Sequence, residues 1–449
     1  MRITHAYSWK PRRVNPIAIT YFAVISLLAC LIIPKQVMAD YGYPIEQAFA
    51  ATVAGTPQAL KAPLPEKYPA TEHAITVFED REIPDIFWHQ DKFHFTAALQ
   101  KNKNAPLIFI IAGTGASHHS PKNTTLGKLF YQQGFHIIAL SSPTYLNFIV
   151  TASESQLPGY LPDDANDLYR AMKLALTELG DKVEPSAFHI TGYSLGGIHA
   201  AFIAALDKKE QSFNFKKVMM INPPVQLYSS VDRLDKLVDN YIPGGAPNAN
   251  EFLNGVVNKL SRIYQKTDKV KFSPDFLYKA YQVIDTDKSI KPEDKFRGAA
   301  GLIGVSFRIS AAAMLFASDV LAKKGYIVPV DQELTSTTSL NHYMRIAHMV
   351  PFTRYVDDML IPHLQGSNPG VSRKTLIHNA SLNSIEPFLK SATNIAVVTN
   401  EDDIILSPAE LNYMKSVFGP RITIYPNGGH LGNMDYKENV EHMLAFFKD

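Results

Sequence analysis

The chain has 449 residues, of which 46% are hydrophobic and 19% are charged, and its formal net charge is +2. These values are ordinary for a globular protein and allow one large domain with an insertion, or two to three domains. Residues 1–39 hold five Lys and Arg and no Asp or Glu, so the remainder carries −3. That balance offers no electrostatic case for binding nucleic acid.

The basic N-terminus has the organisation of an export signal. Arg12-Arg13 precedes an apolar run over residues 17–33, and Val37-Met38-Ala39 follows as a small-residue cleavage site. We therefore predict a signal peptide over 1–39, cut after Ala39. The mature protein is then periplasmic or secreted.

Two other interpretations of this segment stay open. The apolar run 17–33 is at the short edge of a membrane span and would anchor the chain if it is not cleaved. Leu27-Leu28-Ala29-Cys30 resembles a lipoprotein box. Cys30 is the only cysteine, so cleavage of the signal would leave no disulfide, no thiolate metal site and no cysteine nucleophile.

After the signal, strand and helix patterns alternate. Residues 40–70 are rich in Ala and Pro and predict an extended lead-in without a packed element. Strand-like runs follow at 74–78, 92–96, 106–112, 136–140, 187–191 and 217–222, with helical stretches at 126–133 and 163–179. Alternation of this kind predicts right-handed βαβ units, so residues 71–224 are expected to begin a doubly wound, mostly parallel sheet of the α/β class.

The alternation stops at Pro223-Pro224 and resumes near residue 391. Residues 225–390 are mainly helical in pattern, whereas 391–449 contain strands at 394–399 and 421–425 and a helix at 436–447. An insertion of this length is a helical cap or lid rather than a loop. Within it, the apolar run 299–322 contains Arg308 and Asp319, which argue against a membrane span and favour a buried or substrate-facing helix.

One motif stands where a strand meets a helix. Gly192-Tyr193-Ser194-Leu195-Gly196-Gly197 follows the run 187–191 and precedes an Ala-rich helical stretch. This context is the one that a Gly-x-Ser-x-Gly nucleophile elbow requires. The glycines remove Cβ atoms where strand and helix approach. Ser194 is therefore the candidate nucleophile.

A serine needs a base and an acid to activate it. His430 lies in Pro426-Asn427-Gly428-Gly429-His430, directly after the last predicted strand, and is the candidate base. The candidate acid lies after the strand that ends at Thr399, and we choose Asp403, with Asp402 as the alternative. All three sites follow strands, where sites in open α/β sheets form.

Backbone N–H groups are expected to stabilise the oxyanion. Leu195, which follows the nucleophile, supplies one, and the loop Ala112-Gly113-Thr114-Gly115 supplies the other. Thr114 is the chosen second donor and Gly115 the alternative. The loop lacks the third glycine of a dinucleotide motif and has no Gly-Lys-Ser/Thr, so a nucleotide loop is disfavoured.

The remaining histidines are not predicted to bind metal. His118 and His119 are adjacent, and adjacent side chains are expected to diverge; no His-Glu-x-x-His partner exists, so we interpret them as loop residues. His199 is interpreted as a packed core histidine. No metal and no organic cofactor are predicted.

Together these motifs resemble the α/β-hydrolase superfamily. The resemblance rests on Ala112-Gly113-Thr114-Gly115, Gly192–Gly197, Asp403 and Gly429-His430, and it covers roughly half of the chain. It implies the α/β-hydrolase fold with a cap inserted after the strand near Asn222, and the chain order nucleophile, acid, histidine.

The implied activity is acyl transfer to water by a serine hydrolase, esterase-like or lipase-like. The apolar stretches 301–305 and 314–316 of the insertion favour an ester with an apolar acyl group as the substrate. Two alternatives remain: a peptidase or amidase with the same three residues, and a binding protein without catalysis on a hydrolase scaffold.

Overall fold

Eight strands form one sheet in the computed structural model, which describes residues 41–255 and 291–448. Along the sheet the order is β1-β2-β4-β3-β5-β6-β7-β8. The pairs β1–β2 and β2–β4 are antiparallel and every pair from β4 to β8 is parallel. The strands are Ala70–Ile75 (β1), Phe93–Ala98 (β2), Leu107–Ile111 (β3), His136–Leu140 (β4), Phe188–Tyr193 (β5), Lys217–Ile221 (β6), Ile395–Asn400 (β7) and Ile422–Tyr425 (β8).

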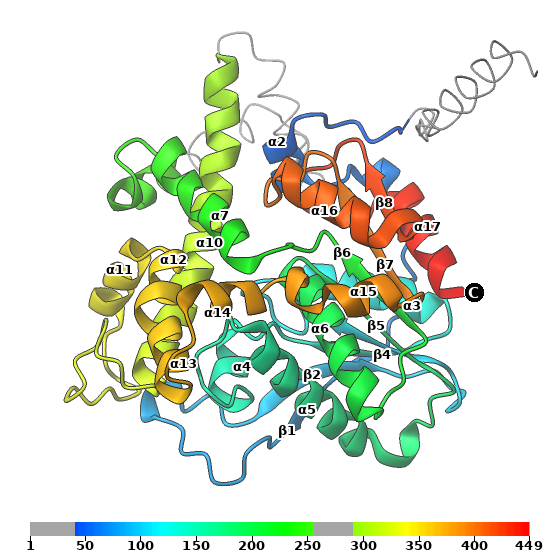
Figure 1. Ribbon diagram of the computed structural model, residues 1–449, viewed down its shortest axis with the longest axis horizontal. Helices are drawn as coiled ribbons and strands as arrows, with labels where there is room; N and C mark the ends of the chain where they lie inside the picture. The colour runs from blue at the N-terminus through cyan, green and yellow to red at the C-terminus, as the bar shows by residue number, and fades with distance from the viewer. Residues whose placement is uncertain (1–40, 256–290, 449) are drawn as a thin grey trace, which may run out of the picture. The chain divides into compact units, whose positions relative to one another are not determined.

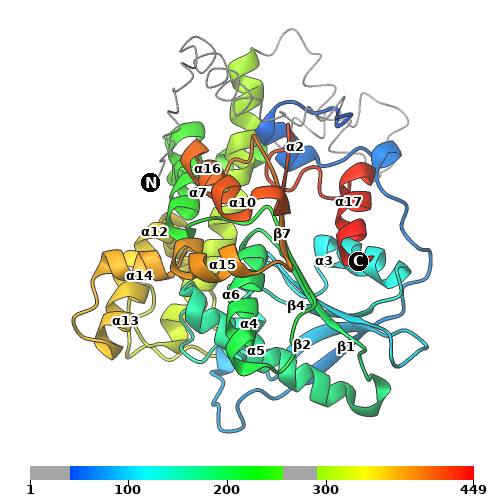
Figure 2. The ribbon, with the colours of Figure 1, turned by 45° about the vertical axis from the view of Figure 1, so that its right-hand side comes forward.

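Helices cover both faces of this sheet (Figures 1 and 2). On one face α3 and α17 pack together, with the rings of Phe130 and Phe447 5.0 Å apart, and α5 and α6 lie on the other face. The core helices are Pro121–Gln132 (α3), Leu146–Thr151 (α4), Leu161–Leu179 (α5), Leu195–Glu210 (α6), Glu386–Ser391 (α15), Pro408–Phe418 (α16) and Lys437–Lys448 (α17). The predicted fold class, a doubly wound and mostly parallel sheet, is confirmed.

The central strands are apolar along their whole length because helices cover both of their faces. All five residues of β3 are fully buried, and so is almost all of β4. This continuous burial is why the runs near 106–112 and 136–140 lack the alternation of a half-exposed strand. The first strand, at the edge of the sheet, runs over Ala70–Ile75 rather than 74–78, and its burial rises toward its C-terminal end.

Between β6 and β7 the chain forms a helical cap, which gathers beside the sheet in Figure 1. Its described helices are Leu227–Tyr241 (α7), Pro292–Leu321 (α10), Asn341–Met349 (α11), Phe352–Tyr355 (α12), Ile361–Ser367 (α13) and Arg373–Asn379 (α14), with a π-helical turn at Val356–Leu360. Short 3-10 turns lie at Gln58–Leu60, Asp85–Phe87, Gly180–Lys182, Ala246–Asn248, Leu382–Ile385 and Gly419–Arg421.

The long cap helix α10 carries the apolar run noted in the sequence. Among the described residues, Glu293–Leu321 is the one helix long and apolar enough to cross a membrane, and 61% of its most apolar window is buried inside the molecule. Arg308 lies 3.4 Å from Asp235 of α7, and Asp319 accepts three backbone N–H groups from Tyr326–Val328. Both charges are therefore satisfied within the cap, as in a buried helix of a folded domain.

The lead-in predicted over 40–70 is wrong for its first half. Helix α2, Ala48–Ala54, forms there, with Gln47 as its N-cap and with Ala50 and Ala51 buried. Residues 43–449 form one compact unit, and residues 1–42 form a second, of which only residues 41 and 42 are described. The predicted signal peptide over 1–39, with Cys30, lies outside the described residues, as does the cap segment 256–290.

Candidate active site

Ser194 stands at the turn between β5 and α6. Its backbone adopts φ 54° and ψ −125°, a left-handed conformation that a non-glycine residue rarely takes. A Cβ on Gly192 would lie 2.2 Å from the carbonyl oxygen of Gly196, and one on Gly196 would lie 2.1 Å from that of Ile111. Backbone packing therefore requires glycine at both positions of the motif. Residues with a strained backbone, such as Ser194, cluster at functional sites.

The structure brings the three predicted side chains together. His430 Nε2 lies 2.9 Å from Ser194 Oγ, and His430 Nδ1 lies 3.0 Å and 3.2 Å from the two carboxylate oxygens of Asp403. The Asp403 side chain is 0% exposed, whereas that of His430 is 13% exposed. A nucleophile, a base within hydrogen-bond reach and a buried acid that orients the base are the parts that serine catalysis needs.

Asp403 is held by groups that the sequence analysis did not identify. Asn222 Nδ2 donates to Asp403 Oδ2 over 2.8 Å, and the Ile405 N–H donates to Asp403 Oδ1 over 3.2 Å. Asn222 directly follows β6 and has φ 46°, which asparagine tolerates better than most residues. The sequence signal that could have identified this partner of Asp403 was an asparagine at a strand end, directly before Pro223-Pro224.

The structure separates the two candidate acids. The carboxylate of Asp402 accepts the N–H of Gly429 at 2.9 Å and that of Gly428 at 3.3 Å. Asp402 therefore holds the backbone before His430, while Asp403 contacts the imidazole itself. Burial raises the pKa of Asp402 above its usual value, and the two backbone N–H groups oppose that shift.

The histidine loop is pressed against α2. The His430 N–H donates to Thr52 Oγ1 over 2.8 Å. Gly429 has φ 57°, and a Cβ there would lie 2.1 Å from the carbonyl oxygen of Ala48. Helix α2 thus positions the base, and no sequence motif in 40–70 indicated this because the contact joins residues far apart in the chain.

The loop after β3 lies beside the elbow and beneath the cap. The N–H of Gly115 donates to Thr144 Oγ1 over 2.8 Å, so it is already used. In the described parts of the chain the N–H of Thr114 donates to no other group. The N–H of Leu195 belongs to the first turn of α6, where backbone donors have no partner within the helix. This arrangement favours Thr114 over Gly115 as the second oxyanion donor.

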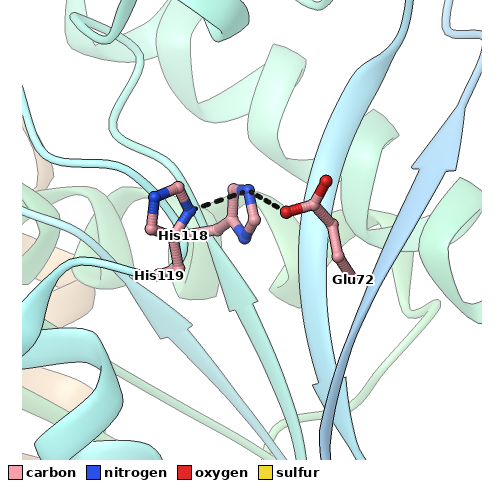
Figure 3. A group of neighbouring side chains, drawn as sticks. All are labelled: Glu72, His118 and His119. Atoms are coloured by element: carbon pink, nitrogen blue, oxygen red, sulfur yellow. Dashed lines mark hydrogen bonds and ion pairs between the residues drawn. The ribbon is translucent and has the colours of Figure 1, made fainter.

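Of the other histidines, His199 is packed as predicted, fully buried and 3.3 Å from Asp164 Oδ2. The expected divergence of His118 and His119 is wrong, because their rings meet at 3.3 Å between His119 Nδ1 and His118 Nε2 (Figure 3). Together with Glu72 they place three metal-ligand atoms within 4.8 Å of one another. Burial lowers the pKa of His118 to about 4, so this imidazole is neutral at physiological pH.

The arrangement is the one that the motifs implied. The serine elbow follows β5, the acid follows β7 and the histidine follows β8, on a mostly parallel sheet with a cap after β6. The chain has the α/β-hydrolase fold. No protein-family model and no curated protein sequence matches it.

Solved structures resemble the fold at low identity. The thioesterase domain from the curacin biosynthetic pathway is 13% identical, with a TM-score of 0.37, 84% of this chain covered and 99% of that one. A membrane phospholipase A, described as a bacterial virulence factor, is 13% identical, with a TM-score of 0.40 and coverage of 96% and 97%. Naproxen esterase from Bacillus subtilis is 14% identical, with a TM-score of 0.36 and coverage of 85% and 92%. Because these scores are low, the fold is taken from the sheet and helices of this chain.

Proposed function

We propose that this protein is an exported serine hydrolase that cleaves carboxylic esters through an acyl-serine intermediate. One observation carries the proposal. The imidazole of His430 bridges the hydroxyl of Ser194 and the buried carboxylate of Asp403, with separations of 2.9 Å and 3.0 Å. That chain of contacts supports an activated serine, which a structural turn would not need.

The proposed reaction begins with attack of Ser194 Oγ on the ester carbonyl carbon. His430 Nε2 takes the hydroxyl proton, and its Nδ1–H donates to Asp403, which stabilises the imidazolium. The protonated Nε2 then gives the proton to the leaving alcohol as the C–O bond breaks. In the second half, His430 takes a proton from water, the resulting hydroxide attacks the acyl carbon, and Ser194 leaves with that proton.

The negative charge that develops on the carbonyl oxygen is stabilised by the N–H groups of Leu195 and Thr114. Thr114 follows Gly113, where a Cβ would lie 3.1 Å from the Tyr193 carbonyl oxygen, and Leu195 is the first residue of α6, so both donors belong to packed backbone. Fixed donors aimed at a developing charge need no reorganisation during the reaction, and one such donor typically contributes about 100- to 1,000-fold in kcat.

An apolar acyl group is the proposed occupant of the surface of α10 that overlies the site. The composition argument relied on the stretches 301–305 and 314–316. The second is buried within the cap and is not available to a substrate, and in the first only Leu302 and Ile303 are partly exposed. Another stripe of α10 remains at least partly exposed: Leu302, Ser306, Ile309, Ser310 and Ala313. A Cβ on Gly115 would lie 2.7 Å from Ser310 Cβ, so this part of α10 lies directly over the oxyanion loop.

Export is part of the proposal and rests on the basic and apolar organisation of residues 1–39. Cleavage after Ala39 would release a mature chain that begins at Asp40. An uncleaved anchor over 17–33 or a lipid on Cys30 would instead hold the hydrolase at a membrane. N-terminal sequencing of the protein from the exported fraction separates these three forms.

The reaction class is tested with a matched ester and amide, p-nitrophenyl butyrate and butyryl p-nitroanilide, assayed on the full chain. We expect kcat/KM to be at least about 100-fold higher for the ester, and Ser194→Ala to lower it by about 10,000-fold or more. Ser416→Ala, which changes an exposed serine, serves as the control and should act like the wild type. Equal rates on both substrates would favour the amidase, and no turnover by folded protein would contradict a hydrolase.

A further inference from the structure

Three side chains that commonly ligate metals converge beside the sheet edge (Figure 3). Glu72 lies in β1, and His118 and His119 lie in the loop that continues from the oxyanion segment toward α3. His118 Nε2 is 3.3 Å from His119 Nδ1 and 3.8 Å from Glu72 Oε2. None of these residues takes part in the proposed hydrolysis.

These separations fit one small divalent cation. With Zn–N bonds of about 2.0–2.1 Å and tetrahedral angles, two ligating nitrogens lie about 3.3 Å apart. The two imidazole nitrogens already have this spacing. Glu72 Oε2 lies 3.8 Å from His118 Nε2, all three ligand atoms lie within 4.8 Å of one another, and the Glu72 side chain is 58% exposed, so a small rotation of this carboxylate would complete the site.

Each of two ligands is oriented by a further partner. Thr96 Oγ1 lies 2.7 Å from His118 Nδ1, so in the tautomer that donates this proton the Nε2 lone pair is directed at the other two ligands. His94 Nδ1 lies 2.9 Å from Glu72 Oε1, which leaves Oε2 for the cation. Such outer partners are typical of metal sites because they fix ring orientation and raise ligand basicity.

Protons alone satisfy this arrangement poorly. In the tautomer that donates to Thr96, His118 Nε2 carries no proton, so it can accept a hydrogen bond from His119 but donates none to the Glu72 carboxylate oxygen 3.8 Å away. A divalent cation at the centre accepts all three lone pairs at once. Two imidazoles and one carboxylate with an open fourth position form a donor set that suits Zn²⁺.

We propose that Glu72, His118 and His119 bind a zinc-like divalent cation that fastens the β1–β2 edge to the oxyanion loop. The histidine pair is linked to the nucleophile segment through Ser120. Ser120 follows His119 in the chain, its Oγ lies 3.0 Å from Tyr193 Oη, and Tyr193 precedes Ser194. A bound cation is thus expected to hold the loop that carries Thr114. The site does not depend on the proposed function and is tested without an assay of hydrolysis.

The test is zinc titration of the metal-stripped full chain, purified in detergent without an oligohistidine tag, by calorimetry and by hydrogen exchange over residues 113–120. We expect one equivalent of Zn²⁺ to bind and to slow exchange in that segment. Thr96→Val should weaken binding about 10- to 100-fold, as loss of an outer partner does, and His119→Ala by at least about 100-fold. His89→Ala, at an exposed histidine, is the control and should bind as the wild type does.

Two results would overturn the site. The first is that wild-type protein binds no Zn²⁺ at micromolar concentration. The second is that Glu72→Gln and His119→Ala bind Zn²⁺ as tightly as the wild type, which would place the bound Zn²⁺ at other residues. Glu72 and His119 are both exposed, so these two variants keep the fold even if a change at the buried His118 does not.

Discussion

The catalytic core holds backbone segments closer together than the cap does. In the core, backbone passes directly over backbone: Gly196 lies against the carbonyl of Ile111, and a Cβ on Gly432 would lie 2.2 Å from the Ala51 carbonyl oxygen. In the cap the approach is looser: a Cβ on Gly304 of α10 would lie 2.9 Å from the Val238 nitrogen of α7, and buried polar side chains also join the helices. Asp235 of α7 meets Arg308 of α10 at 3.4 Å and also accepts the backbone N–H groups of Phe352 and Thr353.

Because of this difference, we expect the core and the cap to tolerate different substitutions. Where two backbone segments leave no room for a Cβ, only glycine fits. Substitution of such a glycine in the core should therefore reduce activity and stability together. Polar contacts between helices tolerate adjustment, so changes in the cap should affect stability or substrate binding while chemistry continues. The four predictions below test that separation, from the largest expected effect to the smallest.

The largest effect is expected from the acid. Asp403→Asn leaves the shape of the site but removes the charge that orients His430, and kcat should fall about 10,000-fold. Asp402→Asn keeps an acceptor oxygen for only one of the Gly428 and Gly429 N–H groups, which bond to different carboxylate oxygens, but it leaves the Asp403–His430 contact in place, and its kcat should fall by no more than about 10-fold. Steady-state kinetics on p-nitrophenyl butyrate measure both, and a larger loss for Asp402→Asn would reverse the assignment of the acid.

The next effect concerns backbone packing at the elbow. Gly196→Ala places a Cβ 2.1 Å from the Ile111 carbonyl oxygen, and the free energy of unfolding should fall by about 3 kcal/mol or more. Gly298→Ala changes a cap-helix position where an added Cβ would meet no atom of residues 41–255 or 291–448 within 4 Å, and it should instead raise the free energy of unfolding by about 0.5–1 kcal/mol. Urea unfolding gives both values, and equal midpoints for the two variants would refute the contrast.

A smaller effect is expected when the buried pair of the cap is broken. Arg308→Met leaves Asp235 with its backbone partners but without its counter-charge, and should cost about 3 kcal/mol of unfolding free energy. The control is Arg354→Met, because the Arg354 side chain is 62% exposed and its ion pair should contribute under about 1 kcal/mol. At a temperature where Arg308→Met is folded, kcat on an acetyl ester should stay within about threefold; a collapse of kcat would show that the cap holds the chemistry as well.

The smallest effect concerns the acyl surface. Ile309 of α10 is 46% exposed beside Ser310, and Ile309→Asp should raise KM for an octanoyl ester about 10-fold, the equivalent of about 1.4 kcal/mol of apolar burial. KM for an acetyl ester should change less than about twofold. Val330→Asp, at a cap residue that is 64% exposed, is the control, and matching shifts for both esters would place the acyl chain elsewhere.

The core site was largely predictable because its signals are local. The glycines around Ser194, the apolar strand runs and the glycines before His430 each report a backbone requirement within a few residues. Asp403 contacts His430 and Asp402 contacts the backbone of Gly429, but the sequence alone, with three adjacent acidic residues, left the two open.

What could not be predicted depends on contacts between distant segments. Thr52 supports His430 from a segment whose Ala and Pro content indicated no packed element. The approach of Glu72 to His118 and His119 needs the pairing of β1 with β2 and the path of the loop after β3, none of which a motif encodes. Likewise, the composition of α10 gave its apolar character but not which stripe faces the site.

The central claim is that Ser194 is an activated nucleophile, and covalent labelling tests it most directly. Full-chain protein is treated with a fluorophosphonate, and the adduct is located by mass spectrometry in the wild type, Ser194→Ala and His430→Ala. Labelling at Ser194 in the wild type that disappears in both variants is the predicted result. A folded wild-type protein that does not label, or labels equally in His430→Ala, would contradict it.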